Sequence, residues 1–148
     1  LSGTKHEQFS IAGGGEGEKV EVIALDNLID DGAVPAGGRY VVKLDVEGVE
    51  VDAMKGGQRL LAADAILIAE DHGHDRAHTV SRYILGQTTL KLFVHDPQSG
   101  RFEHLTELSA LDRIKQFTNV GYNVLATASP YWEQRIRNLG AGSARADR

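Results

Sequence analysis

The 148-residue sequence contains no cysteine, which excludes disulfide bonds, thiolate metal sites and a cysteine nucleophile. It also lacks any apolar run of the roughly 18 to 20 residues that a membrane-spanning helix requires. No secretory signal opens the chain, so we expect a cytoplasmic protein, although a mature or excised chain would look the same. The formal net charge of -5 argues against nonspecific binding to nucleic acid, which usually relies on clustered Lys and Arg.

The composition is that of an ordinary globular protein, with 41% hydrophobic and 25% charged residues, and its length predicts one domain. Residues 1–18 are polar, glycine-rich and without sustained periodicity, which predicts a flexible loop. The glycine triplet at 13–15 follows no predicted strand and precedes Glu16 and Glu18, which disfavours a phosphate site. We expect one domain over residues 19–139 and a disordered tail over 140–148.

The first half of the domain predicts a parallel strand pair. Residues 19–26 predict a strand, and Asp26 could cap a helical turn over 27–30. Residues 39–47 predict the next strand, 49–64 a helix, a glycine break and a second helix, and 65–69 another strand. A mostly helical crossover of roughly 16 residues between two strands is typical of a parallel pair in an α/β sheet.

The second half predicts a helix, a β-hairpin and a closing strand and helix. The helix lies within 77–85, and the hairpin joins strands 89–96 and 101–105. Leu108, Leu111 and Ile114 recur at helical spacing, 121–129 predicts a strand, and 130–139 a helix that begins at a proline. We interpret Tyr131 and Trp132 as packing anchors of that last helix.

The strand over 39–47 carries charges that a central strand should not have. A strand in the middle of a parallel sheet is covered on both faces, and desolvating an ionised carboxylate costs roughly several kcal/mol. One interpretation is a ligand site, because open α/β sheets bind ligands at the carboxyl ends of their strands. The alternative is a structural ion cluster that caps the following helix. We favour the ligand site; the residues on the charged face are Lys43, Asp45 and Glu47.

The segments VIALDNL, VVKLDVEGVEVDAMKGG and AILIAED resemble the C-terminal half of the FkbM family of S-adenosylmethionine-dependent methyltransferases. The match runs from about residue 20 to residue 72, with looser similarity in LFVHDPQSGRFEHL and GYNVLA. Its most specific part is the pattern Lys-x-Asp-x-Glu-Gly-x-Glu, which places acidic residues around one glycine. The matching residues are Lys43, Asp45, Glu47, Gly48 and Glu50.

This resemblance implies the C-terminal part of a Rossmann-like class I methyltransferase sheet, with a β-hairpin after the parallel strands. The complete enzyme would transfer a methyl group from S-adenosylmethionine to an oxygen of a small molecule or glycan. The implied site lies at the ends of two strands. The implied roles are cofactor binding for Lys43, Asp45 and Gly48, catalysis for Asp45, Glu47 and His72, and substrate binding for Glu70 and Asp71.

The glycine-rich loop and the ribose-binding acidic residue that hold the cofactor in the family are not found in this sequence. The resemblance therefore implies either part of a longer enzyme or a shortened relative without the activity. In the family's sheet, the strand over 39–47 pairs with the first strand, which this sequence lacks. We therefore expect the unpaired side of this strand to cause self-association. From a different functional class, the alternative is a noncatalytic α/β module that forms an interface with another chain or domain.

The segment EDHGHDRAH, residues 70–78, raises the possibility of a metal site. His74 and His78 are four residues apart, a spacing that would place both imidazoles on one helical face. The segment is, however, a predicted strand-to-helix loop, and it completes no familiar metal-enzyme pattern. We favour a solvated loop and assign no metal.

Overall fold

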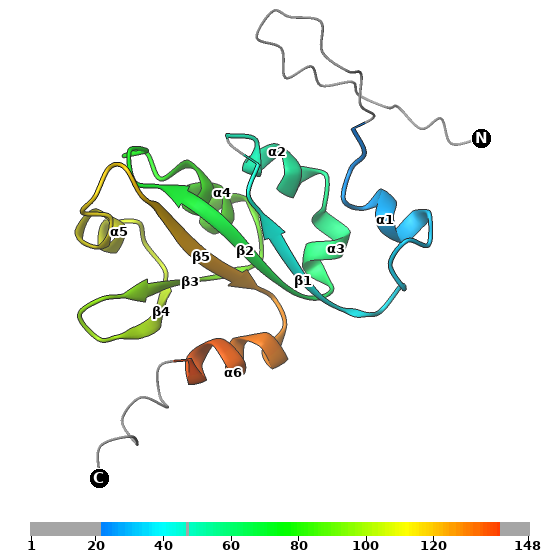
Figure 1. The fold of residues 1–148 in the computed structure, drawn as a ribbon. Coiled ribbons are helices and arrows are strands. Elements are labelled where there is room, and N and C mark those ends of the chain that lie inside the picture. The colour runs from blue at the N-terminus through cyan, green and yellow to red at the C-terminus, as the bar shows by residue number, and fades with distance from the viewer. Residues whose placement is uncertain (1–21, 47, 140–148) are drawn as a thin grey trace, which may run out of the picture.

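The computed structural model describes residues 22–46 and 48–139, which form an α/β protein with a five-stranded mixed sheet (Figure 1). The predictions for residues 1–18, for Glu47 and for the tail at 140–148 lie outside this part of the chain. The elements are α1 (Asn27–Asp30), β1 (Arg39–Leu44), α2 (Glu50–Lys55), α3 (Gln58–Ala62), β2 (Asp64–His72), α4 (Thr79–Gln87), β3 (Lys91–Asp96), β4 (Arg101–Leu105), α5 (Ser109–Ile114), β5 (Gly121–Thr127) and α6 (Pro130–Asn138).

The strand order is β1-β2-β5-β3-β4, so the last of the described strands lies in the middle of the sheet. β1 and β2 are parallel, and α2 and α3 form the crossover between them. β5 runs antiparallel to both of its neighbours, and β3 and β4 form an antiparallel hairpin. The predicted parallel pair, the helix-break-helix crossover and the hairpin are confirmed.

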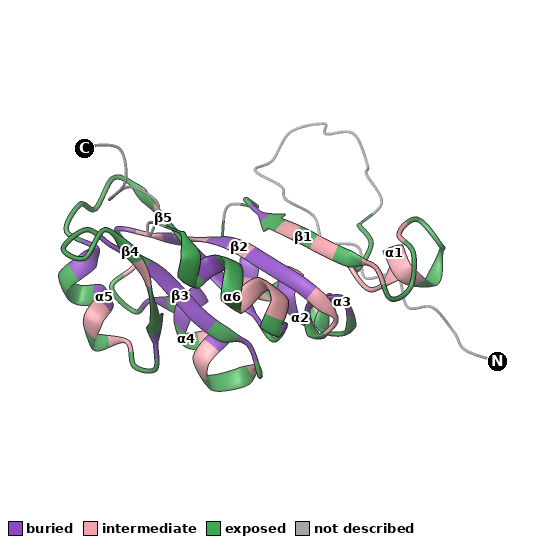
Figure 2. Ribbon diagram, turned by 90° about the horizontal axis from the view of Figure 1, so that it is seen from below, coloured by how far each residue is buried: buried purple, intermediate pink, exposed green. Residues whose placement is uncertain are grey.

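Helices cover both faces of the sheet. Figures 1 and 2 show α2, α3 and α4 on one face and α6 on the other. The larger core lies between the sheet and helices α2, α3 and α4. The smaller core joins Phe93 to Ile136 of α6. Trp132 packs against the smaller core, and its indole N–H donates to the carbonyl of Asp64 at 3.2 Å. This contact confirms Trp132 as a packing anchor.

The strand predicted over 19–26 is wrong for the residues that the structure describes, since 22–24 form no strand and lead into a turn. Alternating apolar residues make a strand only where a neighbour accepts their backbone hydrogen bonds. Asp26 is also not a side-chain cap of α1. Its carboxylate instead accepts the N–H groups of Arg59 and Leu60, at 3.1 and 2.9 Å, in the first turn of α3.

β1 is an edge strand and not a strand covered on both faces, which corrects the expectation for 39–47. It pairs with β2 alone among the described residues, and it ends at Leu44. Exposed residues alternate along β1 (Figure 2). Val41 retains 61% of its surface. The charges of this segment therefore face solvent on one side and need no buried partners.

Candidate functional site

The predicted site residues lie at the carboxyl ends of β1 and β2, which are adjacent because the strands are parallel. Lys43 is the register partner of Ile68, so residues 43 and 45 share a sheet face with residues 68, 70 and 72. This face is opposite to the one covered by α2, α3 and α4, where Leu44 and Ala69 are buried in the larger core. The structure thus brings Lys43, Asp45, Glu70 and His72 together at the carboxyl ends of β1 and β2, which we call the charged edge.

Lys43 and Asp45 form an exposed ion pair at the end of β1. The ammonium nitrogen lies 2.5 Å from Oδ2 of Asp45, and both side chains keep more than half of their surface exposed. The hydrogen bond from Lys43 lowers the pKa of Asp45 below its ordinary value. Asp45 is therefore an accessible, ionised carboxylate, while an exposed pair of this kind adds little to stability.

Glu50 is the first residue of α2, and its side chain is buried, with 3% exposed. Its Oε2 accepts the N–H of Gly48 at 3.1 Å, in a turn where Gly48 takes a φ of +85° that favours glycine. Its Oε1 has no hydrogen-bond partner among the described residues. A buried carboxylate oxygen of this kind is costly, and such exceptions call for an explanation. The sequence indicated Glu50 only as the last member of the Lys-x-Asp-x-Glu-Gly-x-Glu pattern, without a role.

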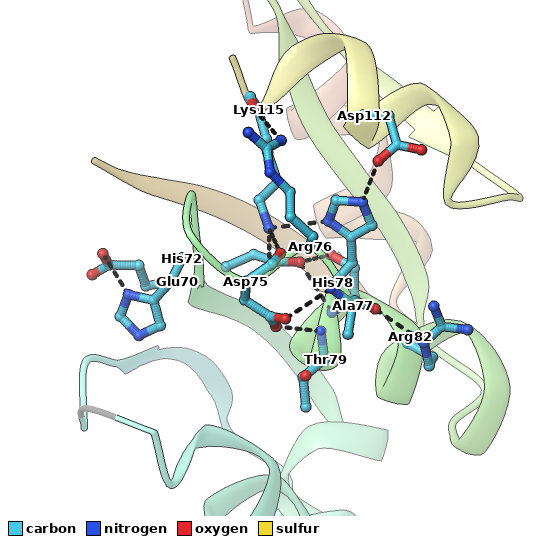
Figure 3. Close-up of polar contacts among 12 residues, drawn as sticks. Glu70, His72, Asp75, Arg76, Ala77, His78, Thr79, Arg82, Asp112 and Lys115 are labelled. Atoms are coloured by element: carbon cyan, nitrogen blue, oxygen red, sulfur yellow. Dashed lines mark hydrogen bonds and ion pairs between the residues drawn. The ribbon is translucent and has the colours of Figure 1, made fainter. Parts of the chain in front are cut away.

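His72 lies between two carboxylates at the end of β2. Its Nε2 is 3.7 Å from Oε1 of Glu50. Its Nδ1 is 3.3 Å from Oε1 of Glu70 (Figure 3). The imidazole is partly exposed and stacks on the ring of His74, with 5.3 Å between the ring centroids. The site therefore offers an imidazole held by flanking groups and open to solvent.

Gly121, opposite His72 on β5, makes room for Glu70. A Cβ atom at residue 121 would lie 1.7 Å from Oε1 of Glu70 and 2.2 Å from its Cδ. The carboxylate of Glu70 thus lies over the backbone of β5, within reach of His72. No sequence signal identified Gly121, because its importance depends on a strand pairing that the sequence does not display.

Asp71 points away from this edge, so the structure does not bring it together with Glu70. β2 continues to His72, and successive side chains of a strand point to opposite faces. Asp71 has no exposed surface, accepts a hydrogen bond from the hydroxyl of Ser81, and lies 2.6 Å from Nζ of Lys115. A side chain in this position is structural and does not face the predicted substrate site beside Glu70.

The ammonium of Lys115 is fully buried and uses all three of its donors. It donates to Oδ1 of Asp71, to the carbonyl of Asp75 at 2.8 Å and to Nδ1 of His78 at 3.0 Å (Figure 3). Because a lysine ammonium only donates, a neutral His78 carries its proton on Nε2, which lies 3.0 Å from Oδ1 of Asp112. This network fixes the turn that follows β2, and sequence patterns gave no sign of it.

His74 and His78 do not converge, because His74 is exposed beside His72 whereas His78 is buried beside Lys115. Within residues 22–46 and 48–139, no group of three or more His, Asp or Glu side chains is arranged to hold a metal ion. A groove of about 470 Å³ lies between α3 and the end of α4, on the opposite face from the charged edge, and Tyr83 is its one titratable lining residue. The charged edge is therefore the better candidate site.

Comparison of the chain with family models, curated proteins and solved structures found no match. No helix in the described part of the chain is long and apolar enough to cross a membrane.

Proposed function

We propose that the chain forms the acceptor side of a Rossmann-like, S-adenosylmethionine-dependent O-methyltransferase of the FkbM type. The observation that carries the proposal is the convergence of Asp45, Glu50 and His72 at the charged edge, where β1 and β2 end. These residues come from the pattern shared with the family and from the end of the following strand. Open α/β sheets place ligands at this edge.

The position of β1 supports the same proposal. In the family's sheet, the strand equivalent to β1 pairs on its other side with the first strand, which leads into the cofactor loop. Within the described residues, this side of β1 has no neighbour. A glycine-rich strand-turn-helix of the complete enzyme would fit there, adjacent to Asp45.

The charged edge also fits a cationic cofactor. S-adenosylmethionine would supply a methyl group bound to a positively charged sulfur. Asp45 is an exposed carboxylate whose pKa is lowered further by the hydrogen bond from Lys43, and a carboxylate favours a nearby positive charge. The residues here would then orient the two ligands and accept the proton of the methylated hydroxyl.

A noncatalytic interface module is the second candidate function. The exposed edge of β1, with Val41 at its centre, favours it, because unpaired strand edges readily pair with another chain. The two candidates differ in what Asp45 does. Only the methyltransferase proposal gives this exposed side chain a role in turnover.

The test is Asp45→Asn in the polypeptide encoded by the intact gene. We expect methyl transfer from radiolabelled S-adenosylmethionine to fall about 10-fold or more, less than the roughly 100-fold or greater loss typical of a proton-transfer group, because Asp45 would orient the ligands. The melting temperature should stay unchanged, since the Lys43–Asp45 pair is exposed. Asp52→Asn is the matched control, because Asp52 forms a similar exposed pair with Lys55 on α2. Full activity of the Asp45→Asn variant would remove Asp45 from the mechanism.

A further inference from the structure

The free oxygen of Glu50 indicates a missing hydrogen-bond donor. Oε1 is buried, has no partner among the described residues and points toward Nε2 of His72 at 3.7 Å. That distance is too long for a direct hydrogen bond. The pair of atoms is therefore arranged around a group that the described residues do not supply.

The chemistry of the two atoms defines that group. A carboxylate oxygen only accepts hydrogen bonds, and a neutral imidazole has one donor and one acceptor nitrogen. Nδ1 of His72 faces Oε1 of Glu70 at 3.3 Å, which favours the tautomer with its proton on Nδ1. Nε2 is then a second acceptor beside Oε1 of Glu50. Two acceptors need two donors, and because a single hydroxyl donates only once, two neighbouring hydroxyl groups of one ligand suit this pair of atoms.

We infer that Glu50 and His72 bind two neighbouring hydroxyl groups of a polyol or glycan acceptor, with His72 as the base and Glu70 as the residue that positions the imidazole. This inference rests on the proposed methyltransferase function and adds to it the base and the chemical class of the acceptor. Glu50 and His72 would touch the acceptor, whereas Glu70 acts through His72. Glu50 would accept a hydrogen bond from one hydroxyl, and His72 would take the proton of its neighbour, which is the hydroxyl that is methylated.

The transfer step balances with the sulfonium methyl donor as the second reactant. The acceptor oxygen forms a bond to the methyl carbon, and the carbon–sulfur bond breaks with its electron pair left on sulfur. The hydroxyl proton moves to Nε2 of His72, which later releases it to solvent through its exposed edge. No oxidant, reductant or metal is required.

The first experiment needs no methyl transfer. The 148-residue chain is titrated with methyl α-D-glucopyranoside while the imidazole ¹H and ¹⁵N resonances of His72 are followed by NMR at pH 8. We expect saturable shifts, with a tautomer signature of Nδ1–H. Glu50→Gln and His72→Gln should each weaken binding about 10-fold or more, and Glu70→Gln should change the tautomer signature of His72.

The controls separate this site from general effects. Glu107→Gln and His95→Gln alter exposed residues outside the site and should bind the glycoside like the wild type. If Glu50→Gln does not fold, the partly exposed His72→Gln still tests the site. Unshifted His72 resonances, or binding by the Glu50→Gln variant equal to that of the wild type, would overturn the inference. Shifts caused by Mg²⁺ in place of the glycoside would also overturn it, in favour of a cation.

A second experiment distinguishes failure of this inference from failure of the proposed function. In the intact gene product, His72→Gln should lower the turnover number about 100-fold or more, while S-adenosylmethionine binding changes less than 2-fold. Methyl transfer that is unaffected by His72→Gln and Glu50→Gln would overturn the inference and keep the methyltransferase. Glycoside binding without any methyl transfer would keep the hydroxyl site and overturn the methyltransferase.

Discussion

Two buried charges of this protein differ in how they are satisfied. Lys115 has three acceptors within 3.0 Å, and its partner Asp71 also accepts from Ser81. Glu50 has one oxygen paired and one free. A fully satisfied buried network fixes local structure, whereas a partly satisfied one marks a place where another molecule can bind.

The first prediction concerns Lys115→Met, which removes one partner of the buried pair. The free energy of unfolding should fall by about 3 to 5 kcal/mol, because Asp71 would keep an uncompensated charge away from water. Urea denaturation followed by circular dichroism measures the change. Lys55→Met is the matched control, and it should leave the urea midpoint nearly unchanged because the Lys55–Asp52 pair is exposed. Equal losses in the two variants would contradict a structural role for the buried pair.

A second residue-scale prediction concerns Gly73, which follows His72. A Cβ atom there would lie 2.0 Å from the carbonyl oxygen of Phe117, a backbone atom that cannot move aside as a side chain can. Gly73→Ala should therefore destabilise the protein by about 2 kcal/mol or more, as overpacking does. Gly86→Ala is the control, because nothing lies within 4 Å of its added methyl group. That helical change should stabilise the protein by about 0.5 to 1 kcal/mol, and thermal melts compare the two.

At the scale of elements, Asp96 joins the β3–β4 hairpin to α5. Its carboxylate accepts two hydrogen bonds from Arg113, at 3.0 and 2.6 Å, and one from the N–H of Gln98 at 2.8 Å. The bond from Arg113 is the main cause that lowers the pKa of Asp96 from 3.8 to about 2. The hairpin is thereby held to a helix that follows it in the chain.

This pairing predicts a pH-dependent stability. A carboxyl with a lowered pKa in the folded state stabilises the protein above its unfolded pKa, and this contribution is lost as the pH falls from about 4 to 2. Because Arg113 is partly exposed, we expect a loss of about 1 kcal/mol in this interval. Asp96→Asn should remove it when urea unfolding is compared at pH 4 and pH 2. An unchanged pH dependence would contradict the assignment to Asp96.

The exposed edge of β1 makes a prediction about association. β1 has a free side among the described residues, and Val41 is its most exposed apolar residue. We expect the 148-residue chain to self-associate with rising concentration, and Val41→Lys to reduce this association, since a lysine on an edge strand opposes pairing. Analytical ultracentrifugation at several concentrations measures both. A monomer at every concentration would contradict edge pairing and indicate that this chain covers its own edge.

The elements show how far the sequence predicts the fold. Helices α2 and α3, the glycine break between them and the β3–β4 hairpin follow from local periodicity and turn residues. The strand expected over 19–26 was wrong at 22–24, and β1 was expected to be covered on both faces. Both errors concern pairing with distant strands, which short-range patterns do not encode. The sequence also predicts Asp71 at the site beside Glu70, since local patterns do not show that β2 extends to His72 and turns Asp71 to the opposite face.

At the scale of the whole molecule, the candidate site lies at the exposed carboxyl ends of β1 and β2, outside the two hydrophobic cores. The described residues contain no glycine-rich strand-turn-helix that would supply backbone N–H groups to a cofactor. We therefore expect the 148-residue chain to bind S-adenosylmethionine weakly, if at all. Isothermal titration calorimetry tests this, with the intact gene product as the comparison. Micromolar or tighter binding by a monomer of this chain would show that the cofactor site is within these residues.

The central position of β5 has a consequence for synthesis on the ribosome. β2 and β3 are made first, but they have no contact as neighbouring strands until residues 121–127 insert between them. β2 can pair with β1 and β3 with β4 before then, but each of these apolar strands keeps one side unpaired until β5 emerges. Pairings between segments so distant in sequence fold slowly and expose surfaces that aggregate. Translation that stalls before residue 121 should thus leave a product that depends on chaperones for solubility.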